Sequence, residues 1–379
     1  MFSFNVLAQR CLEVNQPLYV CFLDYNKAFD KVRHDLLFKL LRRRNLDQRD
    51  VNIIIQLYCS QTAIIREGNA VSEEIKIRRG VRQGCVLSPV LFNTYSEEAI
   101  QNALSEVTAG IKVNGQIVNN LRFADDTLLL AGSLEELQFL IDRVVVGSEK
   151  SGLTLNIKKT CFMVISKEKS QGNLIINGEV IQRVHKCRYL GTIFSDSSDC
   201  SQEIKARIGQ ARSAFNQMRN VLCNRDLRLT LRIRLLKCYV FSVLFYGMEA
   251  WTLKQDTIKR LEAFEMWAYR RILRVSWMKK VTNLEILRRI DKWKEIINTE
   301  KICKLQYLGH IMRGERYHLL QEILQGKIEG RRSVGRRRIS WLDNLKNWFN
   351  CSSSELFSAS RSKDRIAMMI AKLLRGDGT

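Results

Sequence analysis

Three aspartates in two short motifs are the residues of this 379-residue chain best suited to chemistry. Asp24 closes an apolar run, and the adjacent pair Asp125 and Asp126 stands later, with apolar residues on both sides. A carboxylate beside buried apolar residues is costly unless a positive charge compensates it. Mg²⁺ prefers carboxylate and phosphate oxygens, and two such ions can clamp both oxygens of an in-line phosphoryl transfer. The pattern therefore indicates a divalent-metal site, although each motif alone fits an ordinary strand-end turn equally well.

A strand and a hairpin would have to position these acids. The run 18–23 is short, apolar and rich in aromatic residues, which predicts a buried strand ending at Asp24. Apolar residues flank the second motif between 121 and 130, which predicts a hairpin with Asp125 and Asp126 at its turn. If this hairpin lies beside the first strand, Asp24 and Asp125 converge on one point.

A glycine-containing loop lies between the two acidic motifs. Gly80 and Gly84 allow a close backbone approach, while Arg79 and Arg82 supply positive charge. Ser88, followed by proline, is a good helix start, so phosphates or bases could rest at the junction of loop and helix. A surface turn before a core helix is the plainer interpretation.

Charge is distributed very unevenly along the chain. Residues 1–150 hold 18 basic and 18 acidic side chains, whereas residues 151–379 hold 44 and 21, so the later part carries the whole net charge of +23. Nucleic acid is the favoured partner, because each neutralised phosphate releases counterions. A membrane surface or an acidic protein is the alternative. The sequence contains no run of 18 uncharged apolar residues, so no membrane-spanning helix is predicted. The 11 cysteines are scattered, which is typical of reduced thiols in an intracellular protein.

Two basic segments of the later part are candidates for nucleic-acid contact. Between residues 204 and 222, apolar residues recur at helical spacing, and Lys205, Arg212 and Arg219 repeat every seven residues along a neighbouring face. A solvated basic face is the alternative. The run 327–338 is the strongest cluster of charge, and it could bind RNA or target DNA, direct nuclear import or act as a basic linker. Its candidate contact residues are Arg331, Arg332, Arg336, Arg337 and Arg338.

Five short motifs follow one another along the chain. They are FLDYNKAFD (22–30), GVRQGCVLSP (80–89), FADD (123–126), GLTLNIKKT (152–160) and YLG (189–191). Their order and their residues resemble motifs A to E of reverse transcriptases, in particular those of non-LTR (LINE-like) retrotransposons of the RTE/BovB kind. Any one motif is a weak signal, but five in the expected order are highly specific.

The resemblance implies a role for each residue of the acidic motifs. Asp24 and Asp125 would be the principal ligands of two Mg²⁺ ions, with Mn²⁺ as an alternative metal. Asp126 would add negative charge beside them. Tyr25 would offer its backbone carbonyl to the metal.

The resemblance also implies residues that contact the substrates. Phe29 would be an aromatic gate that fills the space of a 2′-hydroxyl and favours deoxynucleotides, a role compatible with a core aromatic at the start of a helix. Gln83 and Gly84 would contact the template and the incoming nucleotide. Lys159, or the lysine before it, would protonate the departing pyrophosphate. Asp30 is expected to cap the helix that follows it.

The implied fold is α+β. It comprises a right-hand polymerase palm, in which an antiparallel sheet packs on helices, then a helical thumb and a helical basic C-terminal region. We assign residues 1–195 to the palm with residual fingers, 196–285 to the thumb and 286–379 to the basic region. Only 23 residues precede Asp24, so we expect the endonuclease and most of the fingers of longer relatives to be missing, as in a truncated copy or an incomplete gene model.

The implied activity is RNA-directed DNA polymerisation by two-metal nucleotidyl transfer to a primer 3′-hydroxyl. The partners would be an RNA template, a DNA primer or target DNA, and dNTPs, in the nucleus or the cytoplasm. Two alternatives stay open. One is a catalytically inactive remnant that still binds nucleic acid, and the other is a two-metal nuclease, which would have no evident use for an aromatic gate at Phe29.

Overall fold

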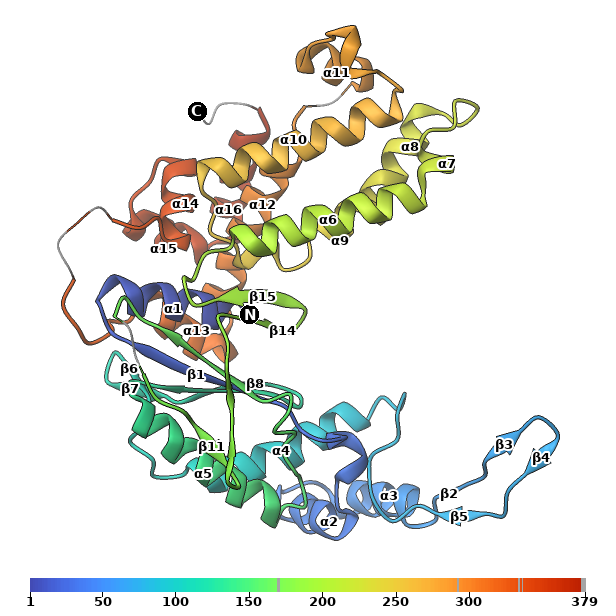
Figure 1. Ribbon diagram of the computed structural model, residues 1–379, viewed down its shortest axis with the longest axis vertical. Helices are drawn as coiled ribbons and strands as arrows, with labels where there is room; N and C mark the ends of the chain where they lie inside the picture. Colours follow the sequence, from blue (N-terminus) through green and yellow to red (C-terminus); the bar gives the residue numbers. More distant parts are fainter. Residues whose placement is uncertain (169–170, 292, 333–334, 336, 376–379) are drawn as a thin grey trace. The chain divides into compact units, whose positions relative to one another are not determined.

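The computed structural model describes residues 1–168, 171–291, 293–332, 335 and 337–375, and they divide into two units. The sheet unit is the continuous stretch Pro17–His185. The helical unit combines Met1–Gln16 with Lys186–Thr379. Figure 1 shows the N-terminal helix, in dark blue, beside orange helices of the C-terminal part, with which it is in contact.

A five-stranded sheet forms the centre of the sheet unit, with β1 (Leu18–Leu23) in its middle. On either side, β1 pairs antiparallel with β9 (Asp126–Ala131) and β10 (Cys161–Ile165). At the edges, β8 (Asn120–Phe123) is antiparallel to β9, and β13 (Gln182–Arg183) is parallel to β10. All side chains of β1 but one are buried, which explains why its sequence is a continuous apolar run rather than an alternation.

Two long helices, α4 (Ser88–Leu104) and α5 (Leu134–Lys150), pack on this sheet. Their apolar sides form one core cluster with Cys21 of β1, Leu129 of β9 and Phe162 of β10, which are direct neighbours in the strand register. Burying a large apolar side chain contributes about 1.5–3 kcal/mol. The cluster therefore fixes the register of the strands that carry the acidic motifs.

A second core cluster joins α2 (His34–Arg43) and α3 (Gln48–Cys59) to α4 and to the 3₁₀ helix Ala28–Lys31. The other strands of the sheet unit form small two-stranded hairpins. These are β2 (Thr62–Ala63) with β5 (Ile75–Lys76), β3 (Arg66–Glu67) with β4 (Ala70–Val71), β6 (Ile111–Val113) with β7 (Gln116–Val118), and β11 (Ile175–Ile176) with β12 (Glu179–Val180).

The helical unit consists of α1 (Phe2–Glu13), a hairpin of β14 (Lys186–Tyr189) and β15 (Thr192–Ser195), and the helices that follow it. These helices are α6 (Ser201–Gln217), α7 (Arg219–Leu222), α8 (Leu229–Leu236), α9 (Ser242–Leu244), α10 (Gln255–Ile272), α11 (Asn283–Ile290), α12 (Ile296–Arg313), α13 (His318–Gln325), α14 (Trp341–Phe349), α15 (Ser353–Ser360) and α16 (Lys363–Arg375). A π-helical stretch (Lys237–Phe241) joins α8 to α9, and short 3₁₀ helices lie at Met248–Ala250, Trp277–Lys279 and Glu315–Tyr317.

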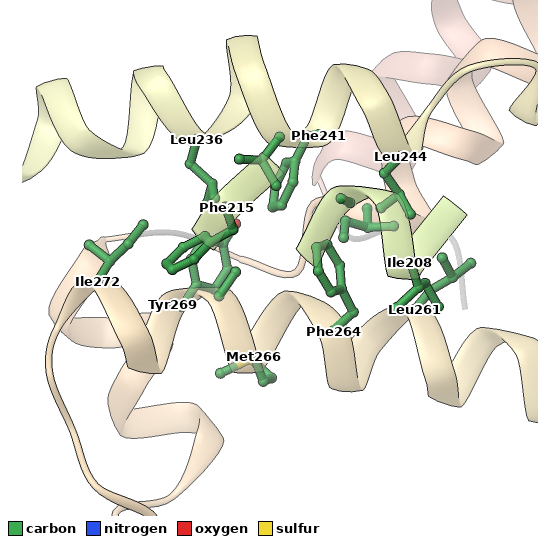
Figure 2. Close-up of a cluster of buried hydrophobic side chains, with 14 of the residues drawn as sticks. Ile208, Phe215, Leu236, Phe241, Leu244, Leu261, Phe264, Met266, Tyr269 and Ile272 are labelled. Atoms are coloured by element: carbon green, nitrogen blue, oxygen red, sulfur yellow. The ribbon is translucent and has the colours of Figure 1, made fainter. Parts of the chain in front are cut away.

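One core cluster holds α6, α8, α9 and α10 together. Figure 2 shows aromatic and aliphatic side chains of these elements pointing toward one another, among them Phe215 of α6 and Phe264 of α10. The apolar stripe expected from residue 204 onward is confirmed, because Ile204, Ile208 and Phe215 are all buried. This stripe fixes which face of α6 is left for its basic residues.

A buried amide joins the end of the chain to the middle of the helical unit. Asn344 of α14 accepts a hydrogen bond from the backbone N–H of Leu253 (2.7 Å) and donates one to its carbonyl (2.9 Å). It also accepts from Nζ of Lys304 in α12 (3.1 Å), whose side chain is fully buried. An unmet buried polar group costs about 1–3 kcal/mol, so these bonds tie α12 and α14 firmly to the segment before α10.

The α+β fold class is confirmed. The two units, however, do not follow the predicted three-part division. Residues 1–16 and 186–195 group with the helical unit, and so do both 196–285 and 286–379. As functional regions, the palm, thumb and basic region stay a prediction. In the part of the chain that the structure describes, no helix is both long and apolar enough to cross a bilayer.

Candidate active site

The strand register brings the two acidic motifs to the same end of the sheet. Leu23, the last residue of β1, pairs with Thr127 of β9. The next step along both strands therefore reaches Asp24 on one side and Asp126 on the other. This pairing places Asp24 and the turn at Asp125 and Asp126 at one end of the sheet, and the core cluster beneath the sheet holds the pairing in place.

Asp125 lies in the tight loop of the β8–β9 hairpin, as predicted. Phe123 pairs with Asp126, which leaves Ala124 and Asp125 as a two-residue loop. Ala124 has φ +55°, the left-handed region that such loops need at their first central position. For a residue other than glycine this conformation costs about 1–3 kcal/mol, which the strand pairing on both sides must offset.

The three carboxylates share one electrostatic environment. Burial raises the pKa of Asp126, and the negative charges of Asp125 and Asp24 raise it further. A cation between them would relieve this repulsion, and carboxylates are the hard oxygen ligands that Mg²⁺ prefers. As they stand, no three acidic, histidine or cysteine side chains among the described residues are grouped closely enough to hold a metal ion. The aspartates fit Mg²⁺ by their chemistry but would have to converge further to share it.

Lys159 is the basic side chain beside this group. Its Nζ lies 4.0 Å from Oδ2 of Asp24, and the lysine side chain is 69% exposed. An exposed ion pair of this kind contributes at most about 1 kcal/mol. Lys159 is therefore held only weakly and stays available to a phosphate. This contact supports Lys159 rather than the preceding lysine as the residue that serves the site.

The segment before Lys159 holds the backbone of the first acidic motif. The N–H of Asn26 donates to the carbonyl of Thr154 (2.9 Å), and the N–H of Asn156 donates to the carbonyl of Asp24 (2.8 Å). The N–H of Asp24 points to the hydroxyl of Thr160 (3.4 Å), which is buried. The N–H and the carbonyl of Asp24 are thus both held, and its part-exposed carboxylate lies beside Lys159.

Tyr25 and Phe29 both pack inward from the turn that follows Asp24. The Tyr25 side chain is buried, and its hydroxyl is hydrogen-bonded to Ser148 of α5 (2.9 Å). Burial raises the pKa of the Tyr25 hydroxyl, although the bond to Ser148 opposes the shift. The half-buried ring of Phe29 stacks on the buried ring of Phe92 in α4, with centroids 4.2 Å apart. The Phe29 ring is thus held by this stacking and stays partly exposed.

The glycine-containing loop packs directly on the turn after Asp24. The N–H of Gly80 donates to the carbonyl of Val32 (2.8 Å), and the N–H of Val81 donates to that of Phe29 (2.9 Å). Gly80 has φ +92°, and a Cβ there would lie 3.1 Å from the Cα and carbonyl oxygen of Asp30. This position therefore requires glycine for both its conformation and its close approach.

The expectation that Asp30 caps the following helix is wrong. Asp30 lies inside the 3₁₀ helix Ala28–Lys31, and the residue before α2 is Arg33, whose side chain makes no capping bond. The Asp30 carboxylate instead accepts a hydrogen bond from Nε2 of Gln83 (3.3 Å). Gln83 is thereby oriented by the first acidic motif. Gly84, with φ +81°, has no atom within 4 Å of where its Cβ would be, so its surface is open.

Arg79 and Arg82, the basic residues of this loop, are both exposed. Nη2 of Arg82 donates to the carbonyl of Leu57 near the end of α3 (2.8 Å), which anchors the loop to that helix. Arg79 pairs by backbone with Arg33. The loop is thus held by its main chain, and the guanidinium groups lie at its surface.

The basic candidates of α6 are exposed, but they do not all lie on one helix. Lys205 and Arg212 lie on α6, whereas that helix ends before Met218 and Arg219 opens the short α7. The Arg212 guanidinium lies 5.4 Å from the centre of the Trp267 ring, a cation–π contact that orients it. The interruption at Met218 thus separates Arg219 from the helix that carries Lys205 and Arg212.

The arginine run near residue 335 is partly held by the chain itself. Arg337 lies 3.7 Å from Asp343, and Arg338 donates to the carbonyl of Ser197 (3.3 Å). Arg331 and Arg332 are exposed, and Arg336 lies outside the described residues. This segment thus retains only part of its charge for an external partner.

Several residues of the site were missed in the sequence. Thr160 and Ser148, which contact Asp24 and Tyr25, lie far from them along the chain. Thr160 ends the fourth motif, but nothing in that motif predicts its contact with Asp24, and no local pattern marks Ser148. His34, whose ring nitrogen is 2.7 Å from the carbonyl of Gly80, is likewise not predicted by any sequence pattern. Ser148 of α5 and His34 of α2 make these contacts through tertiary packing, so periodicity could not have found them.

Comparison with known proteins agrees with the motif order. A family model described as "Reverse transcriptase (RNA-dependent DNA polymerase)" matches residues 3–194. The Pol polyprotein of the type-1 retrotransposable element R2 of Nasonia vitripennis is 34% identical over 189 residues, which are 47% of this chain and 18% of that protein. The RNA-directed DNA polymerase from mobile element jockey of Drosophila funebris is 22% identical over 290 residues, or 75% of this chain and 31% of that protein.

The chain thus spans less than a third of the length of these two relatives. Among solved structures, the telomerase of Candida tropicalis with a fragment of telomeric RNA has a TM-score of 0.41 and 14% identity, over 85% of this chain and 51% of that one. That score is too low to support a conclusion. The family match covers half of the chain, includes all three aspartates and agrees with the relatives' names. The chain belongs to the reverse transcriptase (RNA-dependent DNA polymerase) family, and its homologues are the polymerases of non-LTR retrotransposons.

Proposed function

We propose that this chain is an RNA-directed DNA polymerase that extends a DNA primer on an RNA template, in the nucleus or the cytoplasm. The observation that carries the proposal is the meeting of Asp24, Asp125 and Asp126 at one end of the sheet, where the charges of two raise the pKa of the third. The residues of the five motifs further support a retrotransposon of the RTE/BovB type as the source of this chain.

Asp24 and Asp125 would hold two Mg²⁺ ions, or Mn²⁺ in their place, with Asp126 beside them. When bound, these ions supply the positive charge that in-line transfer between phosphate and a 3′-hydroxyl requires. The Tyr25 carbonyl lies at the same strand end and would face the metal. Lys159, weakly held beside Asp24, would hold the triphosphate and give a proton to the departing pyrophosphate.

The remaining candidates would select and position the nucleotide. The ring of Phe29, fixed by its stacking on Phe92, would exclude a 2′-hydroxyl and so favour dNTPs. Gln83, oriented by Asp30, and the open surface of Gly84 would contact the template base and the incoming nucleotide. Arg79 and Arg82 would meet the phosphates of the template strand.

The test is dNTP incorporation on a primed RNA template with Mg²⁺. We expect the unmodified chain to extend the primer and Asp125→Asn/Asp126→Asn to lose extension while still binding the template. Asp50→Asn, an exposed acid in the first turn of α3, is the matched control and should retain activity. Equal extension by the unmodified and double-variant chains would refute the proposal, as would degradation of the template in the absence of dNTPs.

A second candidate is a chain that binds nucleic acid without catalysis. It is favoured by the exposed basic side chains of the helical unit, such as Lys205 and Arg212, which would bind phosphates without the three aspartates. In that case the chain binds RNA or DNA in a salt-dependent manner, the aspartate variants bind equally well, and no incorporation occurs. Incorporation by the unmodified chain excludes this candidate.

A further inference from the structure

An arginine-lined cavity lies in the helical unit, far along the chain from the three aspartates. It has a volume of about 1080 Å³ and is formed by α7, α10 and the residues that lead into α11. Among the described residues that line it there is no aspartate or glutamate. Four of its lining residues are arginines, namely Arg219, Arg270, Arg271 and Arg274.

Helical spacing explains why two of these arginines share one wall. Arg270 and Arg271 follow Trp267 at steps of three and four residues, so they line the same side of α10, whereas Arg274 lies beyond the end of that helix with φ +54°. The last turn of a helix presents carbonyl groups, which favour cations nearby. The local fold can thus gather this charge without a compensating acid in the wall.

Neutral oxygens orient two of the guanidinium groups. Arg270 donates from Nη2 to the carbonyl of Val281 (2.6 Å) and to Oδ1 of Asn283 (2.9 Å). Arg274 donates from Nε to the carbonyl of Cys223 (2.9 Å). A guanidinium has five N–H donors, and a bond through Nε leaves the terminal nitrogens of Arg274 for an anion.

Trp267 supports a third guanidinium. The Arg271 guanidinium lies 5.5 Å from the centre of the Trp267 ring, and Phe264 stacks on the same ring with centroids 5.7 Å apart. Trp267 is therefore already packed and cannot serve as a platform for a base. Its cation–π contact instead holds the guanidinium plane, whose edge carries the donors that match a phosphate.

We propose that this cavity binds a single-stranded segment of nucleic acid through its phosphates. Clustered guanidinium groups with no acid among the lining residues match consecutive phosphates, and the volume of about 1080 Å³ lies at the upper end of the range for small-molecule pockets, which leaves room for a short strand. A duplex is stiff over such short lengths, whereas a single strand can bend into a concave site. The site goes beyond the proposed polymerisation, because it needs neither dNTPs nor the three aspartates.

The experiment measures binding of fluorescein-labelled oligouridine RNA to the full chain by anisotropy, without dNTPs and with EDTA, over a range of salt. Its test variant is Arg219→Gln/Arg271→Gln, since neither side chain donates a hydrogen bond that holds the fold in the contacts described above. Arg234→Gln, on an exposed position of α8 outside the cavity, is the control for charge lost elsewhere, and it removes one charge where the test variant removes two. Oligothymidine DNA and an RNA duplex are the comparison probes.

We expect the double variant to flatten the dependence of log K on log salt by about 1.4, because each single-strand phosphate contact contributes about 0.7. At about 0.1 M salt this corresponds to a loss of affinity of about 25-fold, with a much smaller loss for the Arg234→Gln control. Arg271→Lys keeps the charge but not the planar guanidinium, so its loss of affinity should lie between those of the double variant and the Arg234→Gln control. It replaces the double variant in the assay if that variant does not fold. A loss confined to RNA assigns the cavity to RNA, and an equal loss for oligothymidine assigns it to either single strand.

Two results would overturn the proposal. One is an unchanged salt slope and affinity in the double variant, and the other is an equal loss for the duplex probe, which would make the cavity part of a general phosphate-contacting face. Since the assay contains no metal and no dNTP, it gives its answer whether or not the chain polymerises. A failure of the polymerase assay and a failure of this one are therefore distinguishable.

Discussion

Replacing the buried Glu265 of α10 by glutamine should stabilise the helical unit above neutral pH. Its Oε1 accepts hydrogen bonds from the N–H of Glu295 (2.6 Å) and from the hydroxyl of Tyr269 (3.2 Å). Oε2 is buried without a hydrogen-bond partner among the described residues. Burial raises the pKa of the Glu265 carboxyl from 4.5 to about 7. The ionised form is therefore disfavoured in the folded protein.

The sign and size of the effect follow from linkage. Below pH 4.5 the carboxyl is protonated in both states, and between pH 4.5 and about 7 only the unfolded state has released its proton. The free energy of unfolding therefore falls as pH rises through this window and stays low above it. At about 1.4 kcal/mol per pH unit, the whole loss is about 3 kcal/mol. Glutamine keeps the accepting oxygen and has no charge to bury, so it should recover this amount at pH 8 and change little at pH 4.5.

Urea unfolding followed by tryptophan fluorescence measures this directly. All six tryptophans follow residue 250 and so lie in the helical unit, which means that their emission reports on that unit alone. Glu315→Gln, at an exposed position of the same unit, is the control and should stay within about 0.5 kcal/mol of the unmodified chain at every pH. The reasoning is refuted if Glu265→Gln and the unmodified chain have parallel profiles between pH 4.5 and 8.

Further predictions concern the acidic site. Gly80→Ala should destabilise the sheet unit by about 1–3 kcal/mol, because the methyl group would crowd the backbone of Asp30 at a φ of +92°. Circular dichroism during urea unfolding measures the loss, and Gly84→Ala, strained in φ but with open space around it, should lose less; equal losses would contradict the crowding argument. Asp125→Asn should lower the pKa of Asp126, since it removes one of the charges that raise it. A carbon-detected NMR titration of the Asp126 carboxyl tests this, and an unchanged or higher midpoint would contradict the shared electrostatic environment.

The elements that carry the acids could be predicted because their signals are local. The buried strand before Asp24, the hairpin tip at Asp125 and the apolar stripe of α6 each depend on residues within one element. Periodicity and turn chemistry report such elements directly. That these elements belong to one site was implied by the resemblance, because a local pattern does not contain this information.

The sequence did not predict what depends on distant contacts. From its sequence neighbours alone, Asp30 would be expected to cap a helix. In the structure the loop at Gly80 packs on it, and Asp30 lies within a 3₁₀ helix instead. The hairpin β14–β15 follows the sheet unit without a break, yet its contacts are with the helices after it. Of the cavity arginines, only Arg219 was a candidate in the sequence; Arg270, Arg271 and Arg274 lie in a segment where charge is common, so composition could not separate them from a solvated face.

The division of the chain also has a consequence for its synthesis. The sheet unit is a continuous insert, so a ribosome can release all of it and let it fold while the remainder is still being made. Helix α1, by contrast, is made before the sheet unit but packs against segments that follow that unit in the chain, such as α13. Phe4 of α1 meets the ring of Phe194 only after the whole sheet unit has been made, and until then the apolar side of α1 stays exposed to chaperones or to other nascent chains. The helical unit can therefore close only after the sheet unit and the later helices have been synthesised.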